Sequence, residues 1–143
     1  MTFVAAPVPV VVDASFAVSG VMHNASAEAS WERWAEEGRM VRAPAIVWPE
    51  IANALLVGHR WTISDVVAGL QSVEAAGLET ADRGPLGVQF ALDLARRHRL
   101  SVYDATYLWL AIDIDGELAT FDRALAKAAE AEGVPLAMAL PAA

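Results

Sequence analysis

Four acidic side chains stand where the sequence pattern changes from one predicted element to the next: Asp13, Glu50, Asp104 and Asp122. Their flanking residues are mostly apolar, and a buried carboxylate is rare unless it is paired or bound to a metal. Clustered carboxylates repel one another, so either some of them hold protons or a divalent cation neutralises them. Oxygen ligands without histidine or cysteine favour Mg²⁺ or Mn²⁺ over zinc. One or two such ions can activate water and stabilise charge on a phosphodiester under in-line attack.

Each acid also has a purely structural interpretation. An Asp at the start of a helix commonly caps it, and this alternative stays open for Asp104 and Asp122. Glu50 could interact with the dipole of its helix in the first turn. Asp13, which follows three valines, has the weakest structural explanation. The occurrence of all four in this order favours a shared site over coincidence.

Alternating strand-like and helix-like segments must position these acids. Strands are predicted at residues 9–13, 40–43, 78–81 and 117–120, with a candidate edge strand at 136–138. Helices are predicted at 15–22, 26–37, 46–57, from a cap at 62 or 64 to 76, and at 85–98, 104–114 and 122–132. This alternation with short links predicts an α/β layered fold with a mostly parallel sheet. Sites in such sheets form outside the carboxyl ends of the strands, where these acids would converge.

Composition bounds the class of protein. The 143 residues fit a single domain spanning 1–143, in which we expect 1–7 to be a frayed lead. The absence of cysteine excludes disulfides, thiolate metal sites and a cysteine nucleophile. The net charge of −8 argues against a simple nucleic-acid-binding module, although an acidic enzyme can act on RNA if its carboxylates hold cations. No long apolar run or basic N-terminal start is present, so we expect a cytoplasmic protein without a membrane span.

Four segments resemble the motifs of the PIN-domain family, in the same order and with the same spacing. They are VVVDAS at residues 10–15, PEIANAL at 49–55, YDATYLWLA at 103–111 and LATFDRAL at 118–125. The nearest type is VapC, the toxin of bacterial and archaeal toxin–antitoxin pairs. The resemblance covers about residues 8–138. It implies a PIN-like three-layer fold, in which a mostly parallel sheet of four to five strands is flanked by helices.

The resemblance also implies a metal site. Its catalytic, metal-binding acids match Asp13, Glu50, Asp104 and Asp122. The expected cofactor is Mg²⁺, with Mn²⁺ as a substitute, and the position of Asp122 varies most in the family. Ser15 and Thr120 match positions where family members often place a hydroxyl, so we expect both to hydrogen-bond to the metal ligands. Asn53 shares a helix face with Glu50 and would either hydrogen-bond to the site or only pack beside it.

The sequence therefore predicts an endoribonuclease that hydrolyses RNA phosphodiester bonds with metal-activated water, as the toxin of a toxin–antitoxin pair. The family implies a homodimer and a small antitoxin that lays a segment over the active site. DNA would be bound only indirectly, through the antitoxin. The alternative is a non-catalytic PIN-like binding or scaffold protein regulated by a small partner, which the acidic charge and the 56% apolar share would suit. A phosphatase is disfavoured because Ala14 and Ser15 follow Asp13, where a second Asp would be needed, and no Gly-rich phosphate loop is present.

Other notable residues keep two interpretations each. The histidines lack the spacing of metal ligands: His23, His59 and His98. The densest basic run suits a solvated helix end or contact with RNA phosphates: Arg96, Arg97 and Arg99. Arg123 could face the substrate or pair with a carboxylate. Trp31 and Trp34 favour core or oligomer packing, although they could also anchor an antitoxin. The acids around Gly116 lack the spacing of a calcium-binding loop and predict a solvated turn.

Overall fold

The computed structural model describes residues 5–141, and its centre is a parallel four-stranded sheet. The strands are β1 (Val10–Val12), β2 (Val41–Ala43), β3 (Leu78–Thr80) and β4 (Glu117–Ala119). Their order across the sheet is β3-β2-β1-β4, and every neighbouring pair is parallel. All three valines of β1 are fully buried, as expected for a β-branched apolar strand that is covered on both faces. The predicted α/β fold and its four main strands are confirmed.

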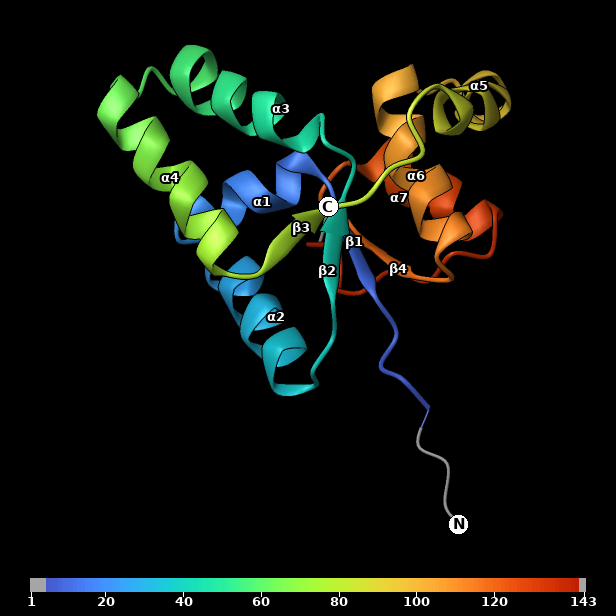
Figure 1. Cartoon of the computed structure of the whole chain (residues 1–143), viewed down its shortest axis with the longest axis horizontal. Helices are drawn as coiled ribbons and strands as arrows, with labels where there is room; N and C mark the ends of the chain where they lie inside the picture. The colour runs from blue at the N-terminus through green and yellow to red at the C-terminus, as the bar shows by residue number, and fades with distance from the viewer. Residues whose placement is uncertain (1–4, 142–143) are drawn as a thin grey trace.

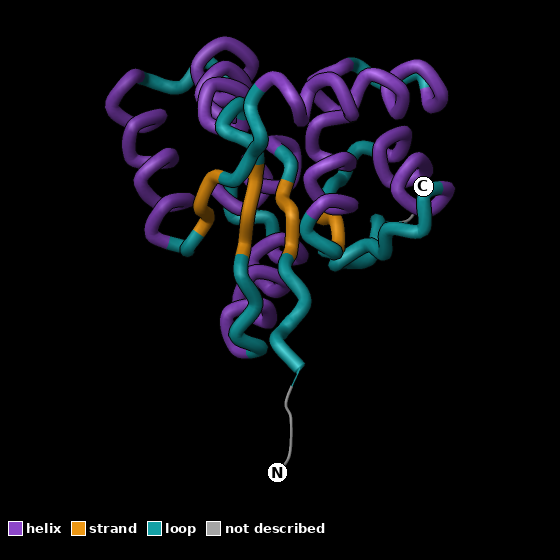
Figure 2. Tube along the Cα trace, turned by 45° about the vertical axis from the view of Figure 1, so that its right-hand side comes forward, coloured by secondary structure: helices purple, strands orange, loops and turns teal. Residues whose placement is uncertain are grey.

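Seven α-helices flank this sheet in the described residues: α1 (Ala14–Val21), α2 (Ala25–Glu36), α3 (Val47–Asn53), α4 (Ile63–Ala75), α5 (Pro85–His98), α6 (Val102–Asp113) and α7 (Arg123–Ala131). A π-helical turn, η1 (Ala54–Gly58), continues α3. Figure 1 shows α1 to α4 on one side of the sheet and α5 to α7 on the other, and Figure 2 shows the strands running side by side between the helices. Helix α6 packs on β1 and β4, the two strands that lead to Asp13 and Thr120. No helix among residues 5–141 is both long and apolar enough to cross a membrane.

The candidate edge strand at 136–138 is reduced to a single parallel bridge between Leu136 and Leu118. The bridge consists of hydrogen bonds from Leu118 N to Pro135 O and from Ala137 N to Leu118 O. Beyond it, the carbonyl of Ala137 accepts hydrogen bonds from the side chains of Arg33 and Trp34. These side-chain donors replace the strand neighbour that a longer ladder would need, so the sheet keeps four strands.

The helix predicted at 104–114 begins two residues earlier, at Val102. Ser101 is its N-cap, because the Ser101 hydroxyl accepts a hydrogen bond from the backbone N–H of Asp104. The prediction that Asp104 opens this helix is therefore wrong, and Asp104 lies in the first turn. Asp122 does cap α7, and Glu50 lies in the first turn of α3 as predicted.

Candidate active site

Parallel pairing of β1 and β4 brings Asp13 and Thr120 together. Val12 lies opposite Ala119, and each of these strands is followed directly by one of the two polar residues. The backbone N–H of Asp13 donates to the carbonyl of Ala119 at 3.1 Å, which continues the ladder by one bond. The Thr120 hydroxyl donates to Oδ2 of Asp13 at 2.5 Å. Two segments more than one hundred residues apart thus meet at the carboxyl edge of the sheet.

The Asp13 carboxylate is buried and held by several donors. Its Oδ1 atom accepts hydrogen bonds from the Ser15 hydroxyl at 2.7 Å and from the backbone N–H of Phe16 at 2.9 Å, the second of which caps α1. Asp13 is only 4% exposed. Burial raises its pKa from 3.8 to about 6, although the hydrogen bonds from Thr120, Phe16 and Ser15 lower it and the charge of Asp104 raises it further. Burial therefore disfavours the ionised form of this carboxylate in the folded protein.

Asp122 is connected to the same group of side chains through Thr120. Its Oδ1 atom accepts hydrogen bonds from the backbone N–H groups of Ala124 and Leu125, at 2.9 and 3.1 Å, and so caps α7. Its own backbone N–H donates to the Thr120 hydroxyl at 2.9 Å. Thr120 is fully buried and links the Asp13 carboxylate to the start of α7. Capping is thus one role of Asp122, and it leaves the second carboxylate oxygen without a hydrogen bond from residues 5–141.

Glu50 is held by Tyr107, a residue that the sequence did not predict as part of the site. The Tyr107 hydroxyl donates to Oε1 of Glu50 at 2.6 Å. Burial raises the pKa of Glu50, the hydrogen bond from Tyr107 lowers it, and the charge of Asp104 raises it. The pKa of Tyr107 is raised, first by burial and then by the hydrogen bond to Glu50 and the charge of Glu50. The charges of Asp13 and Asp104 raise it further, so the Tyr107 hydroxyl stays protonated and remains a donor. The available signal was that Tyr107 follows Asp104 by one helical turn and that a buried tyrosine hydroxyl needs a partner.

Asp104 is electrostatically central to these acids. It is half-buried in the first turn of α6. Burial and the charge of Asp122 raise the pKa of Asp104, while the charge of Asp104 in turn raises the pKa values of Asp13 and Glu50. We refer to these four acids together as the acid pocket, a name for the group of side chains and not for a measured cavity: Asp13, Glu50, Asp104 and Asp122. Asp104 thus lies close enough to Asp13 and Glu50 to disfavour their ionised forms, and Asp122 acts on Asp104 in the same way.

The donor chemistry of the acid pocket fits a divalent cation. Of the eight ion pairs formed within residues 5–141, none includes a member of the acid pocket. The chain therefore supplies several desolvated carboxylate oxygens and no basic partner, which is the composition that Mg²⁺ and Mn²⁺ prefer. In this conformation, however, no three acids or histidines of the described chain converge closely enough to hold one ion together. The acids match the ion in charge and donor type, but they do not form a closed coordination shell.

Other residues singled out by the sequence have different partners. Asn53 is exposed, and its side chain makes no hydrogen bond to the acid pocket within the described chain. Arg97 and His98 both contact Glu132, and Arg123 donates to the carbonyl of Pro141. The acids of the predicted turn at Gly116 include two that pair with arginines, in the pairs Asp113–Arg83 and Glu117–Arg39.

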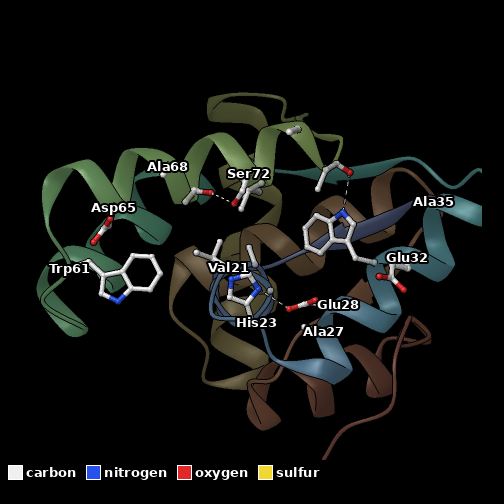
Figure 3. A pocket seen from close by; sticks show the side chains of 17 residues that line it. Val21, His23, Ala27, Glu28, Glu32, Ala35, Trp61, Asp65, Ala68 and Ser72 are labelled. Carbon is white, nitrogen blue, oxygen red and sulfur yellow. Dashed lines mark hydrogen bonds and ion pairs between the residues drawn. The ribbon is translucent and has the colours of Figure 1, made fainter.

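A separate apolar groove of about 790 Å³ lies between α2 and α4, with α1 as its floor (Figure 3). The side chains of Trp31 and Trp61 line it, and the Trp31 indole N–H donates to the carbonyl of Ala76 at 3.0 Å. Its other lining residues include three acids: Glu28, Glu32 and Asp65. No member of the acid pocket lines this groove, so the two features are distinct surfaces.

Comparison with known proteins gives both a family match and a structural match. The family model of the PIN domain matches residues 10–131. The crystal structure of PAE2754 from Pyrobaculum aerophilum is 23% identical, with a TM-score of 0.63, and the match covers 85% of this chain and 84% of that one. The structure of Mycobacterium tuberculosis VapC20, described as a sarcin-ricin loop cleaving toxin, is 21% identical, with a TM-score of 0.65 and coverage of 83% and 94%. No curated protein sequence matches the chain. At these identities the two structures establish a shared fold.

Proposed function

The chain belongs to the PIN domain family, and we propose that it is a Mg²⁺-dependent endoribonuclease, for which Mn²⁺ can substitute. The family and the three-layer fold predicted from the four motifs are confirmed. The proposed catalytic and metal-binding residues are the members of the acid pocket. PIN domains are generally nucleases, which supports the reaction class.

One observation carries this proposal: the Asp13 carboxylate is 4% exposed, the charge of Asp104 raises its pKa, and no basic side chain pairs with it in the described chain. Asp104 is coupled in the same way to Glu50 and Asp122. Such an arrangement costs folding free energy, and perturbed carboxylates of this kind concentrate at functional sites. A bound divalent cation would supply the balancing charge and polarise water or a phosphate oxygen for hydrolysis.

The chain's own residues would orient the ligand oxygens before an ion arrives. Ser15, Thr120 and the N–H of Phe16 hold the Asp13 carboxylate in one rotamer. Backbone N–H groups at the start of α7 hold Asp122 in the same manner. Preorganised ligands spend less conformational entropy on binding. Within residues 5–141 no three acids or histidines converge on one point, an observation that favours the non-catalytic alternative, and a measurement of activity distinguishes the two.

That measurement is cleavage of RNA by the purified chain with Mg²⁺ or Mn²⁺, and then with EDTA. We expect cleavage with either ion, none with EDTA, and a loss of roughly 10³-fold in Asp13→Asn, because that change removes a charged ligand of the ion that would stabilise developing charge. Asp93→Asn is the matched control, since Asp93 is an exposed acid that pairs with Arg97, and its activity should equal wild type. Cleavage that survives both EDTA and Asp13→Asn would exclude the acid pocket as the active site.

We further propose that the chain is the toxin of a toxin–antitoxin pair and is silenced by a small antitoxin. The apolar groove beside Trp31, with its acidic lining residues, suits an amphipathic segment that carries Lys or Arg on its polar side. Charge reversal in the double variant Glu32→Lys/Asp65→Lys should weaken binding of the antitoxin, taken as a small protein encoded by the neighbouring gene and co-expressed with the chain, at least about tenfold. RNA cleavage by the free chain should not change. Equal affinity for wild type and variant, measured by calorimetry, would exclude the groove as the binding site of the antitoxin.

We also propose that the chain forms a homodimer. Four exposed apolar residues on α5 suit a dimer interface, and the test is the mass of the protein in solution: Leu86, Val88, Phe90 and Leu92.

A further inference from the structure

Glu50 differs from the aspartates of the acid pocket in how it is held. The Asp13 carboxylate accepts three hydrogen bonds and the Asp122 carboxylate accepts two, mostly from the same local segment of chain. Glu50 has one more rotatable side-chain bond than an aspartate, and within residues 5–141 its carboxylate accepts a single hydrogen bond, from Tyr107. The orientation of Glu50 therefore depends on one hydroxyl from another helix.

Tyr107 is placed to fix Glu50 relative to Asp104. It is 1% exposed and follows Asp104 by one turn of α6, so the two residues share a helix face. The 2.6 Å separation between the Tyr107 hydroxyl and Oε1 of Glu50 is that of a charge-assisted hydrogen bond to a carboxylate. The bond joins α6 to α3 across 57 residues of sequence. It thus ties two members of the acid pocket that come from different helices.

We propose that Tyr107 is a positioning residue of the metal site: it holds Oε1 of Glu50 and leaves Oε2 directed to a divalent cation. This inference rests on the proposed metal dependence and deepens it. Within the described residues no donor contacts Oε2, so that oxygen is available. A phenol suits the role because it is an uncharged donor. A lysine or arginine at this position would neutralise Glu50 and compete with the cation, whereas the phenol orients the carboxylate and preserves its charge.

The test is Tyr107→Phe, which keeps the buried ring and removes only the hydroxyl. Without its donor, Glu50 must be ordered when the ion binds, and loss of a hydrogen bond to a metal ligand typically costs about 10–100-fold in affinity. We expect the Kd for Mn²⁺, measured by calorimetry, to rise by about that factor. The melting temperature in EDTA should stay close to that of wild type. The matched control is Tyr103→Phe, since Tyr103 is the chain's other tyrosine, lies on the same helix and is 59% exposed, and its Mn²⁺ affinity should not change.

A Glu50→Ala background separates positioning from a merely structural role. If Tyr107 acts through Glu50, adding Tyr107→Phe to Glu50→Ala should cause no further loss of Mn²⁺ affinity. Equal affinity for wild type and Tyr107→Phe, or an undiminished loss in the Glu50→Ala background, would overturn the inference.

A second measurement does not depend on the stability of Tyr107→Phe. In Tyr103→Phe the only tyrosine is Tyr107, and Mg²⁺ binding should change its absorption difference spectrum, because the ion withdraws electron density from Glu50. A saturating Mg²⁺ titration that leaves this spectrum unchanged would overturn the positioning role. Absence of any Mn²⁺ binding by wild type would overturn this inference and the proposed metal dependence together. Mn²⁺ binding that is sensitive to Tyr107→Phe, in a chain that cleaves no RNA, would overturn only the nuclease function.

Discussion

Two acidic clusters of this protein have opposite electrostatic properties. The acid pocket contains no basic residue, and burial raises the pKa of Asp13 to about 6. The second cluster, which we call the ion-pair cluster, joins the end of α5 to the end of α7: Asp93, Arg97, His98 and Glu132. Glu132 accepts hydrogen bonds from Nε2 of His98 at 2.7 Å and from Nη1 of Arg97 at 2.8 Å. The hydrogen bond from His98 is the largest cause that lowers the pKa of Glu132.

The difference lies in where the positive charge comes from. In the ion-pair cluster the chain supplies its own cations, so the cluster is complete and can serve the packing of α5 near α7. In the acid pocket the chain supplies hydroxyls, backbone N–H groups and a phenol, which orient carboxylates but do not neutralise them. A set of acids that is oriented without being neutralised is destabilising by itself, and an external cation would remove that cost. The pair of clusters thus shows why charge balance identifies a site better than acid clustering alone.

The largest effect on stability should come from Asp13. Its pKa is 3.8 in the unfolded chain and about 6 in the folded one, so the folded state holds the proton more tightly. This contribution is fully present below pH 4 and is lost as the pH rises to about 6, which amounts to about 3 kcal/mol. Urea unfolding in EDTA should therefore show Asp13→Asn gaining about 3 kcal/mol relative to wild type between pH 4 and pH 7.

Asn is a suitable replacement because it can also cap α1, so the change isolates the charge. Repeating the series with saturating Mn²⁺ should abolish the relative gain, since a bound ion would favour the ionised carboxylate. If the difference in free energy of unfolding between wild type and Asp13→Asn does not change with pH in EDTA, then the Asp13 charge is not unbalanced in the folded chain. The contrast between the acid pocket and the ion-pair cluster would then be wrong.

The sequence predicted the part of the acid pocket that depends on local pattern and parallel pairing. Three valines followed by Asp13 identify a buried strand and its carboxyl end, and a strand followed by Thr120 identifies the neighbouring end. Parallel pairing of two such strands then places both residues at one edge of the sheet. There the hydroxyl oxygen of Thr120 lies 2.5 Å from Oδ2 of Asp13. The family motifs added the expectation that hydroxyls would lie beside the acids.

Features that depend on contacts between distant helices could not be predicted in the same way. The segment from Ala105 to Ala111 is almost entirely apolar, so its pattern does not show which face Tyr107 occupies or that its partner is 57 residues away. Ser101 and Asp104 are both good caps within one turn, and local preference alone does not choose between them. The segment at 136–138 is apolar and is a candidate edge strand in the sequence, but the carbonyl of Ala137 accepts hydrogen bonds from side chains of α2. In each case tertiary contacts decided what local propensity left open.

The smallest effect should come from Glu132→Gln in the ion-pair cluster. This change keeps the shape of the side chain but removes the charged acceptor of Arg97 and His98. We expect the free energy of unfolding at pH 7 to fall by at most about 1 kcal/mol, because solvent screens the charges of a surface cluster. The pKa of Glu132 is lowered, so its contribution is present above its ordinary value of 4.5 and disappears as the pH falls through the folded value. The loss of stability in Glu132→Gln relative to wild type should therefore grow as the pH rises, whereas Asp13→Asn should gain stability over the same range. The loss should shrink in high salt, and urea unfolding measures both effects. RNA cleavage should be unchanged. A charge that the chain already neutralises with Arg97 and His98 should not affect the reaction. A large loss of cleavage in Glu132→Gln would therefore mean that the ion-pair cluster also takes part in RNA cleavage.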